Sequence, residues 1–300
     1  MRLIILGASG LIGRQLDLEA CGQGLDVIGT YCHRPVEGMI HFDLTKSPIR
    51  DVASDLGKED VVFMLSSNIN QNWVKDNPRD SRKLNVEANI KAIKEAATAG
   101  SKIIYISSEA IFDGALGCYS EDSAPNPLTL YAQQKLEIEN YIQESALNFC
   151  IIRTGWTVGW GDIGADPIFG IYKALLNEGA KMAEDNIFTM TDVCDTCQAI
   201  LKLVDQKCQG IYHVAANPPV TRTQLADWII EFSQNGANMS YETVQFADLT
   251  FAEPRPTKSW ISNQKLIEEF DQTFMSSQEV VKARVTQIDS KIEEPERTST

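Results

Sequence analysis

The chain has 300 residues, of which 43% are hydrophobic, and this composition argues against disordered and fibrous classes. Its 41 acidic and 27 basic side chains give a formal net charge of -14, which argues against a general nucleic-acid-binding face. The seven cysteines are odd in number, which suits reduced thiols, and no stretch approaches the roughly 18 apolar residues of a membrane span. We therefore expect a cytoplasmic protein with no nucleic-acid or membrane partner.

Strands and helices are predicted to alternate through the first half of the chain. Apolar runs predict strands at residues 3–6, 26–30, 61–65, 102–107 and 149–153. The intervening segments are long enough for helices, the first of which is predicted from Leu11 to about Cys21. This alternation predicts an α/β fold, a Rossmann-type doubly wound parallel sheet covered on both faces.

Three glycines lie between the first predicted strand and the first predicted helix. Gly7 permits a sharp turn, Gly10 lets the backbone approach a pyrophosphate, and Gly13 lets the helix pack on the strand. The free N–H groups of the helix start would then face the phosphates. The pattern predicts a dinucleotide site, with a purely structural glycine turn as the alternative.

The end of the second predicted strand bears on the choice of cofactor. A site for NAD usually has Asp or Glu there to bind the ribose hydroxyls, and this strand ends without an acid. Arg34 lies just beyond it and would suit a 2′-phosphate, although a solvated loop arginine is the alternative. We expect NADP, with NAD as the second choice.

The rest of the chain divides into two predicted regions and a tail. Residues 78–99 are predicted as one amphipathic helix, ended by Gly100, with an apolar stripe of Val86, Ile90, Ile93 and Ala97. Residues 1–153 form the dinucleotide-binding core, and 154–290 a smaller, glycine-rich substrate-binding region. Cys208–Val214 and Thr221–Phe232 are expected to return to the main sheet, and 291–300 to form a flexible tail.

A predicted helix and a predicted strand place polar side chains close together at the carboxyl edge of the sheet. Tyr131 and Lys135 are four residues apart on one helix face, where the ammonium would lower the pKa of the phenol. Ser107 and Ser108 end a strand at the edge where such sheets bind ligands. A hydroxyl there could bind the same carbonyl oxygen that the tyrosine protonates.

These motifs together resemble the extended short-chain dehydrogenase/reductase superfamily, and within it the dTDP-4-dehydrorhamnose reductase family. The likeness covers about residues 1–270 and includes ISSEAIFDG at 106–114, PNPL at 125–128, IRTGW at 152–156 and RPT at 255–257. It implies an NAD(P)-dependent oxidoreductase in which Ser108 binds the carbonyl oxygen, Tyr131 is the acid and Lys135 its partner. It also implies a substrate-side aromatic ring at Trp156 and a site-shaping amide at Asn85.

The resemblance implies a full set of site residues. The expected catalytic residues are Ser108, Tyr131 and Lys135, and the expected substrate contacts are Ser108, Glu109 and Trp156. The expected cofactor contacts are Gly7, Ser9, Gly10, Leu11, Ile12, Gly13, Tyr31, Arg34, Asp43, Leu44, Leu65, Ser66, Ser67, Asn85, Tyr131 and Lys135. No metal is expected, because Cys194 and Cys197 lack the further ligands that a zinc site needs.

Two positions depart from the family pattern and bear on the substrate. Ala110 stands where the reductase has a tyrosine, and Glu109 stands where it has an aspartate. We therefore expect an NADP-preferring reductase of a nucleotide-linked keto sugar, such as a 4-keto-6-deoxy sugar, with a pocket unlike that of the rhamnose pathway. A nucleotide-sugar epimerase, and a non-catalytic NADP-binding subunit resembling the methionine adenosyltransferase β subunit, are the alternatives. A homodimer is the expected assembly.

Overall fold

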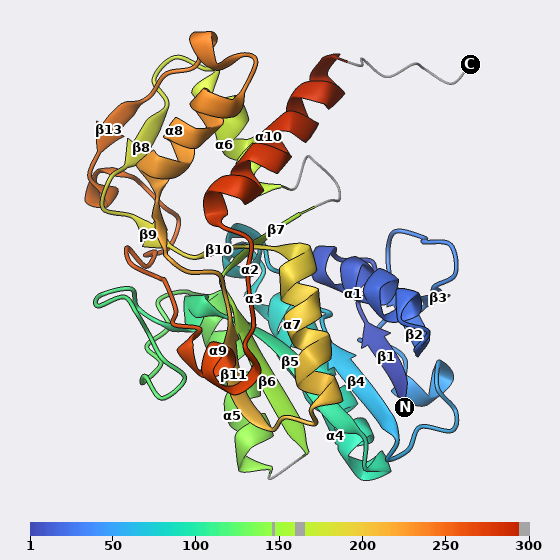
Figure 1. The fold of residues 1–300 in the computed structure, drawn as a ribbon. Coiled ribbons are helices and arrows are strands. Elements are labelled where there is room, and N and C mark those ends of the chain that lie inside the picture. The colour runs from blue at the N-terminus through green and yellow to red at the C-terminus, as the bar shows by residue number, and fades with distance from the viewer. Residues whose placement is uncertain (146–147, 160–165, 294–300) are drawn as a thin grey trace.

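A seven-stranded sheet dominates the computed structural model, which describes residues 1–145, 148–159 and 166–293. All paired neighbours in this sheet run parallel, in the order β11-β6-β5-β4-β1-β2-β3 (Figure 1). The strands are β1 (Arg2–Leu6), β2 (Asp26–Tyr31), β3 (Ile40–His41), β4 (Asp60–Met64), β5 (Lys102–Ser108), β6 (Phe149–Thr154) and β11 (Gly210–Val214). The predicted doubly wound parallel sheet is confirmed.

Helices cover both faces of this sheet because alternate strand residues point to opposite sides. In β1, Leu3 and Ile5 pack into the cluster under α1 and α7, whereas Ile4 and Leu6 pack into the cluster under α4 and α5. The helices of this body are α1 (Leu11–Gly22), α2 (Gln71–Asp76), α3 (Pro78–Arg82), α4 (Asn89–Ala99), α5 (Leu130–Glu144), α7 (Val193–Asp205) and α9 (Gln264–Phe270). None of the described helices is long and apolar enough to cross a membrane.

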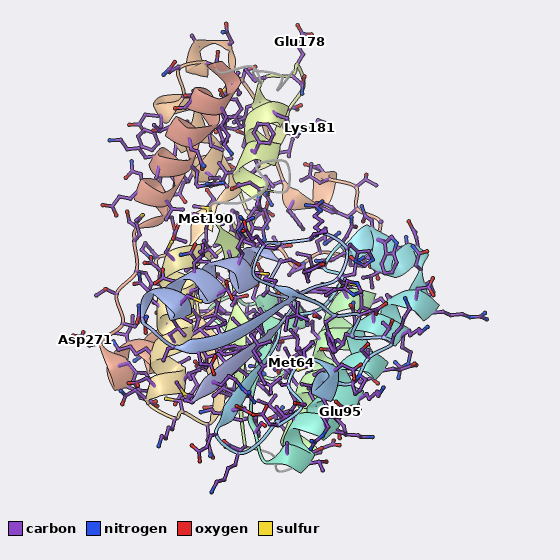
Figure 2. The ribbon with its side chains drawn as sticks, turned by 90° about the vertical axis from the view of Figure 1, so that its right-hand side faces the viewer. Met64, Glu95, Glu178, Lys181, Met190 and Asp271 are labelled. Atoms are coloured by element: carbon purple, nitrogen blue, oxygen red, sulfur yellow. The ribbon has the colours of Figure 1, made fainter. Side chains whose placement is uncertain are left out.

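A smaller region rises from the carboxyl edge of the sheet and has its own apolar cluster. Its helices are α6 (Pro167–Leu175), α8 (Arg222–Phe232) and α10 (Ser277–Glu293). Its strands are β7 (Trp156–Val158), β8 (Lys181–Ala183), β9 (Ile187–Phe188), β10 (Met190–Asp192), β12 (Val220–Thr221) and β13 (Glu242–Val244). In Figure 2, Met64 marks the sheet, Lys181 marks the smaller region and Met190 lies between them.

Three local expectations need correction. Residues 78–99 are not one regular helix, because a π-helical turn at Lys83–Ala88 separates α3 from α4. Cys208–Val214 does return to the sheet as β11, but α8 does not, since it packs on α6 and α10 in the smaller region. The expected tail begins too early, because α10 continues to Glu293; residues 294–300 lie outside the described structure.

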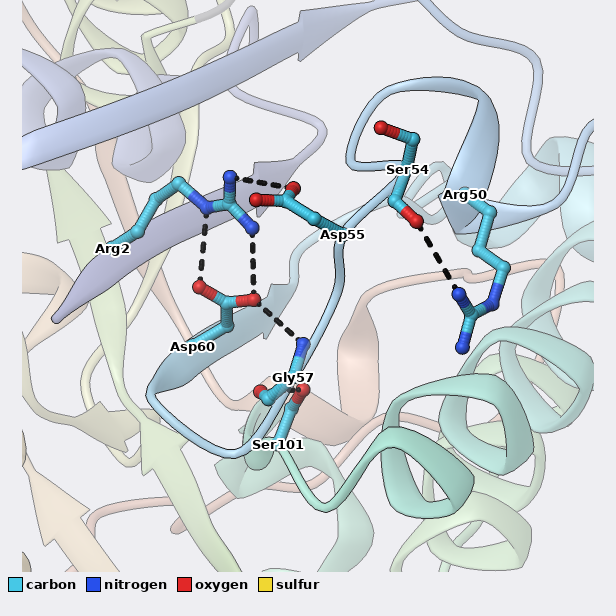
Figure 3. A network of polar contacts seen from close by, with 7 residues as sticks. All are labelled: Arg2, Arg50, Ser54, Asp55, Gly57, Asp60 and Ser101. Atoms are coloured by element: carbon cyan, nitrogen blue, oxygen red, sulfur yellow. Dashed lines mark hydrogen bonds and ion pairs between the residues drawn. The ribbon is translucent and has the colours of Figure 1, made fainter.

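An ion-pair network fixes the edge of the sheet opposite the carboxyl ends of the strands (Figure 3). Arg2 at the start of β1 donates from Nε and Nη2 to both carboxylate oxygens of Asp60, at 3.1 and 2.9 Å, and from Nη1 to Asp55 at 2.9 Å. Asp60 also accepts from the Gly57 N–H at 2.8 Å. These contacts lock the register of β1 and β4, whose other ends form the site.

Candidate active site

Most of the predicted site residues line one cavity of about 360 Å³ at the carboxyl ends of the central strands. The cavity lies between the first turn of α1, the end of β5 and the start of α5. The predicted residues that line it are Gly7, Gly10, Leu11, Ile12, Gly13, Leu65, Ser67, Ser108, Glu109, Tyr131, Lys135 and Trp156. Residues from the first helix turn and residues more than 100 positions later, such as Tyr131 and Lys135, thus meet at one site.

The glycine turn has the geometry that its sequence predicts. Gly7 has a positive φ of 94°, and a Cβ there would lie 2.9 Å from the Ser66 nitrogen. A Cβ on Gly13 would lie 2.5 Å from the Gly7 carbonyl oxygen, so the helix could not pack this closely. Gly10 is the N-cap of α1, and no side chain caps that turn. The free N–H groups of the first turn therefore face the cavity.

Ser108, Tyr131 and Lys135 converge on this cavity from β5 and α5. The Ser108 hydroxyl donates to Glu109 Oε2 at 3.1 Å and accepts from the Ala110 N–H at 3.2 Å, and it lies close enough to Tyr131 to lower the pKa of that phenol. Lys135 Nζ donates to the Ile106 carbonyl at 2.9 Å and lies 5.9 Å from the centroid of the Tyr131 ring. The phenol and the serine hydroxyl can therefore bind one carbonyl oxygen together.

The protonation of Tyr131 differs from the expectation that Lys135 lowers its pKa. Burial, and then the nearby Glu109, raise the pKa of Tyr131, while the bond with Ser108 opposes this. Burial also lowers the pKa of Lys135 to about 8, which weakens its charge, and its ammonium contacts the Ile106 carbonyl instead of the phenol oxygen. Tyr131 is thus held as a neutral phenol, the form that can donate a proton.

Glu109 is a buried carboxyl group at the edge of the catalytic set. Its side chain is only 7% exposed, and burial raises its pKa to about 7, against the opposing effect of its bond with Ser108. At neutral pH it therefore exchanges between the acid and the carboxylate. As a carboxylate it makes proton loss from Tyr131 less favourable.

A second cavity, of about 570 Å³, lies on the other side of the glycine turn. The predicted residues along it are Gly7, Ser9, Gly10, Tyr31, Asp43, Leu44, Leu65, Ser66 and Ser67. Arg34 is exposed in the loop after β2, and the cavity wall reaches His33 without including it. Asp43 contributes a carboxylate instead, whose pKa the contacts with Lys46 and Thr45 lower to about 2.

Asn85 lies outside these two cavities and supports the loop after β4. Its side chain is buried, accepts from the Asn68 N–H at 2.8 Å and donates to the Asn68 carbonyl at 3.0 Å. It also donates to Gln134 on α5 at 2.9 Å. Asn85 is on neither cavity lining, and its hydrogen bonds join the loop after β4 to α5, the helix that carries Tyr131 and Lys135.

A third cavity, of about 230 Å³, continues from the 360 Å³ cavity that contains Ser108 and Tyr131, past Glu109, Ala110 and Trp156. Arg222 lies there with its guanidinium 4.6 Å from the centroid of the Trp156 ring, and Nη2 donates to Asn186 at 3.1 Å. Burial lowers the pKa of Arg222 to about 10. Arg255 lines the same cavity, and its buried Nε has no hydrogen-bond partner. Within the described ranges, neither guanidinium forms an ion pair.

Sequence reasoning did not assign this third cavity. Phe246 and Phe251, whose ring centroids are 5.1 Å apart, complete its wall from a segment with little regular structure. Arg255 had a signal, the RPT motif at 255–257, but Arg222 is a single arginine at a helix start. Ser107 was expected at the strand end but not among the site residues; it lines the 360 Å³ cavity, is buried, and its hydroxyl has no partner in the described chain.

Cys194 and Cys197 lie on α7 as free thiols. Burial is the main cause that raises the pKa of Cys194, to about 12, and it also raises the pKa of Cys197. Among the described residues, no group of three or more His, Cys, Asp or Glu side chains is placed to hold a metal ion. These cysteines therefore contribute to the packing of α7 against α1.

The family model described as the RmlD substrate binding domain matches residues 1–290. The chain belongs to this family. It is 29% identical to the methionine adenosyltransferase 2 subunit beta of Xenopus tropicalis over 235 residues, or 75% of this chain and 70% of that protein. It is 24% identical to the dTDP-4-dehydrorhamnose reductase of Mycobacterium tuberculosis over 272 residues, or 88% and 86% of the two chains.

A solved structure has the same fold over nearly the whole chain. The dTDP-4-dehydrorhamnose reductase of Bacillus anthracis, in complex with NADP, superposes with a TM-score of 0.79 at 22% identity and covers 96% of this chain and 99% of its own. The predicted resemblance and fold class are thus confirmed, and the relatives include oxidoreductases of the predicted superfamily. The roles of individual site residues remain predictions.

Proposed function

We propose that the protein reduces a carbonyl group of a nucleotide-linked sugar, with NADPH as the preferred reductant. The observation that carries this proposal is the convergence of Ser108, Tyr131 and Lys135 with the glycine turn in one cavity. Similarity to reductases of nucleotide-linked sugars supports the reaction class. The cytoplasm, where NADPH and nucleotide sugars are available, is the proposed location, and a homodimer the proposed assembly.

The residues present fit a nicotinamide dinucleotide. Gly10 lines both the catalytic cavity and the 570 Å³ cavity, and an added Cβ would meet only the Gly7 carbonyl oxygen, at 3.5 Å, so it would occupy the space between the two. The uncapped first turn of α1 supplies N–H donors for a pyrophosphate. When bound, the reduced cofactor supplies the hydride for the carbonyl carbon.

Residues of the chain would protonate the carbonyl oxygen and donate a hydrogen bond to it. Tyr131 is held as a neutral phenol by burial, so it can give its proton to the oxygen as negative charge develops there. The Ser108 hydroxyl would turn its single proton from Glu109 Oε2 to the same atom and donate a second hydrogen bond there, while it still accepts from the Ala110 N–H. Lys135, whose ammonium donates to the Ile106 carbonyl, would hold the cofactor ribose.

The third cavity supports an anionic, nucleotide-linked substrate. Arg222 and Arg255 present two partly buried guanidinium groups that form no ion pair within the described ranges, although Glu253 lies near enough to Arg255 to act on its charge, and charge that loses water is stable only when paired. A diphosphate would supply the missing charge. Phe246 and Phe251 offer ring faces for a base. Trp156 and Glu109 line both this cavity and the catalytic one, so a sugar would lie between them.

One assay tests the reaction class directly. Purified protein is incubated with NADPH and a panel of nucleotide-linked keto sugars, and oxidation of NADPH is followed by absorbance. We expect turnover with at least one sugar, and a raised KM with little change in kcat for Arg222→Ala. Consumption of NADPH by none of the panel would contradict the proposal.

The second candidate function is a non-catalytic, NADP-binding subunit. The observation that favours it is the similarity to the methionine adenosyltransferase 2 subunit beta. This alternative predicts cofactor binding without turnover, and binding to a methionine adenosyltransferase catalytic subunit in a pull-down with both purified proteins. An epimerase would use the same three residues, and it would interconvert nucleotide sugars without net consumption of NADPH.

A further inference from the structure

Residues 252–256 form a bridging segment between the third cavity and the catalytic helix. At one end, Lys75 on α2 donates from Nζ to the Ala252 carbonyl at 2.6 Å. At the other, Pro256 packs on Gly114, where a Cβ would lie 2.5 Å from the Pro256 side chain. Gly114 follows the short helical turn that begins just after Ser108. The bridging segment is thus held at both of its ends, at Ala252 by Lys75 and at Pro256 by Gly114.

Glu253 makes the contact in the middle of this segment. Its Oε1 accepts a hydrogen bond from the Leu130 N–H at 2.9 Å, across 123 residues of sequence. Leu130 is the first residue of α5, and the Thr129 side chain caps the Ala132 N–H of the same turn at 3.2 Å. A carboxylate at a helix start is also favoured by the helix dipole. Glu253 therefore secures the turn that contains Tyr131.

The same segment carries Arg255 into the third cavity. Only one residue separates Glu253, which holds the start of α5, from Arg255, whose Nε is buried and without a partner. Residues 252–256 are exposed or partly buried, so these contacts, not deep burial, determine where the segment lies. Glu253 therefore links two positions: that of a group bound by Arg255 in the third cavity, and that of the Tyr131 phenol on α5.

We propose that Glu253 is a positioning residue for Tyr131, through its hydrogen bond to the Leu130 N–H. This inference rests on the proposed reductase function. Its physical basis is that proton transfer requires the donor within hydrogen-bond reach of the carbonyl oxygen, and that a displacement of about 1 Å can cost up to about 100-fold in rate. Glu253 sets this geometry without touching the reacting atoms.

Three variants test the proposal. Glu253→Ala removes the acceptor, whereas Glu253→Gln keeps a carbonyl oxygen that can still accept from Leu130. Asp195→Asn is the matched control, since Asp195 also accepts a distant backbone N–H, from Met275 at 2.6 Å, away from α5. The measurements are kcat and KM for an active keto sugar, and the affinity for NADPH.

We expect Glu253→Ala to lower kcat by about 10- to 100-fold, with NADPH affinity within about threefold of wild type and a rise in KM smaller than the loss in kcat, since Glu253 also lies near Arg255. Glu253→Gln should restore kcat to within about threefold, and Asp195→Asn should match wild type. Arg255→Ala should instead raise KM, because it removes a binding group. Wild-type kcat in Glu253→Ala, or equal losses in Glu253→Ala and Asp195→Asn, would overturn the proposal.

Amide hydrogen exchange at Leu130 separates this inference from the proposed function. We expect faster exchange in Glu253→Ala, and exchange near the wild-type rate in Glu253→Gln and Asp195→Asn. If wild type reduces no sugar in the panel, the proposed function fails, but the exchange result still tests the contact. Unchanged exchange at Leu130 in Glu253→Ala would show that Glu253 does not hold the helix start, whatever the substrate.

Discussion

Replacing Glu109 with glutamine should change the stability of the protein in a pH-dependent way. In the folded protein burial raises the pKa of this carboxyl from the ordinary 4.5 to about 7. Below pH 4.5 the folded and unfolded states both carry the proton, so the group contributes nothing. Between pH 4.5 and 7 the unfolded state loses its proton first, and folding becomes less favourable as the pH rises.

The size of the effect follows from these two values. At about 1.36 kcal/mol per pH unit, the difference between 4.5 and about 7 corresponds to about 3 kcal/mol of lost stability above pH 7. Glu109→Gln removes the titration and keeps a similar shape. The stability of this variant relative to wild type should therefore increase by about 2 to 3 kcal/mol between pH 5 and pH 8.

Urea unfolding at pH 5 and pH 8 measures this difference. Glu178→Gln is the control, because Glu178 is exposed in the loop before β8 and should follow wild type at both pH values (Figure 2). The same titration should lower the reduction rate above pH 7 in wild type, since the carboxylate opposes proton loss from Tyr131. A stability difference between Glu109→Gln and wild type that is equal at both pH values would refute the reasoning.

Three further predictions concern the cofactor, the lysine and the substrate. NADPH should bind about 10- to 100-fold more tightly than NADH by calorimetry, and Arg34→Ala should lose that preference. Equal affinities would favour the Asp43 carboxylate as the dominant group, and an NADPH preference that survives in Arg34→Ala would show that Arg34 does not bind the 2′-phosphate. Lys135→Ala should reduce both NADPH affinity and kcat. If neither changes, Lys135 takes no part in cofactor binding or in the reaction. Ala110 lines the third cavity at the position where the family resemblance implies a tyrosine, so kcat/KM should be lower for dTDP-4-dehydrorhamnose than for another nucleotide-linked keto sugar. The reverse order would show that Ala110 does not set the specificity.

The sequence was sufficient for elements whose signals are local. The order of strand, glycine turn and helix at residues 2–22 depends on backbone conformations that glycine permits, and the structure has them. The four-residue spacing of Tyr131 and Lys135 fixes one helix face in the same way. Both features follow from neighbours in the chain, so they could be predicted.

Other features depend on contacts between distant segments. The π-helical turn at residues 83–88 occurs where the Asn89 side chain donates to the Leu84 and Asn85 carbonyls and also to Ser66 on the loop after β4. Periodicity alone gave no indication of these bonds. The third cavity likewise joins Arg222 and Arg255, which lie 33 positions apart on unrelated elements.

The pKa of Tyr131 could not be derived from the spacing alone. Spacing predicted that Lys135 lowers it, but burial of both groups and the neighbouring Glu109 have the larger effect. Burial is a property of the folded chain, and the short helical turn that begins with Glu109 packs directly against α5, which comes later in the sequence. The spacing predicts Tyr131 as the proton donor, whereas the direction of its pKa required the structure.

Single-turnover reduction of a nucleotide-linked keto sugar by wild type and Tyr131→Phe, with NADPH affinity measured in parallel, tests the proposed reaction most directly. The substitution removes one proton donor and little else, so we expect the rate to fall by about 10² to 10⁴-fold while NADPH affinity stays within about twofold. A Tyr131→Phe protein that retains most of the wild-type rate would contradict the proposal that this phenol protonates the carbonyl oxygen.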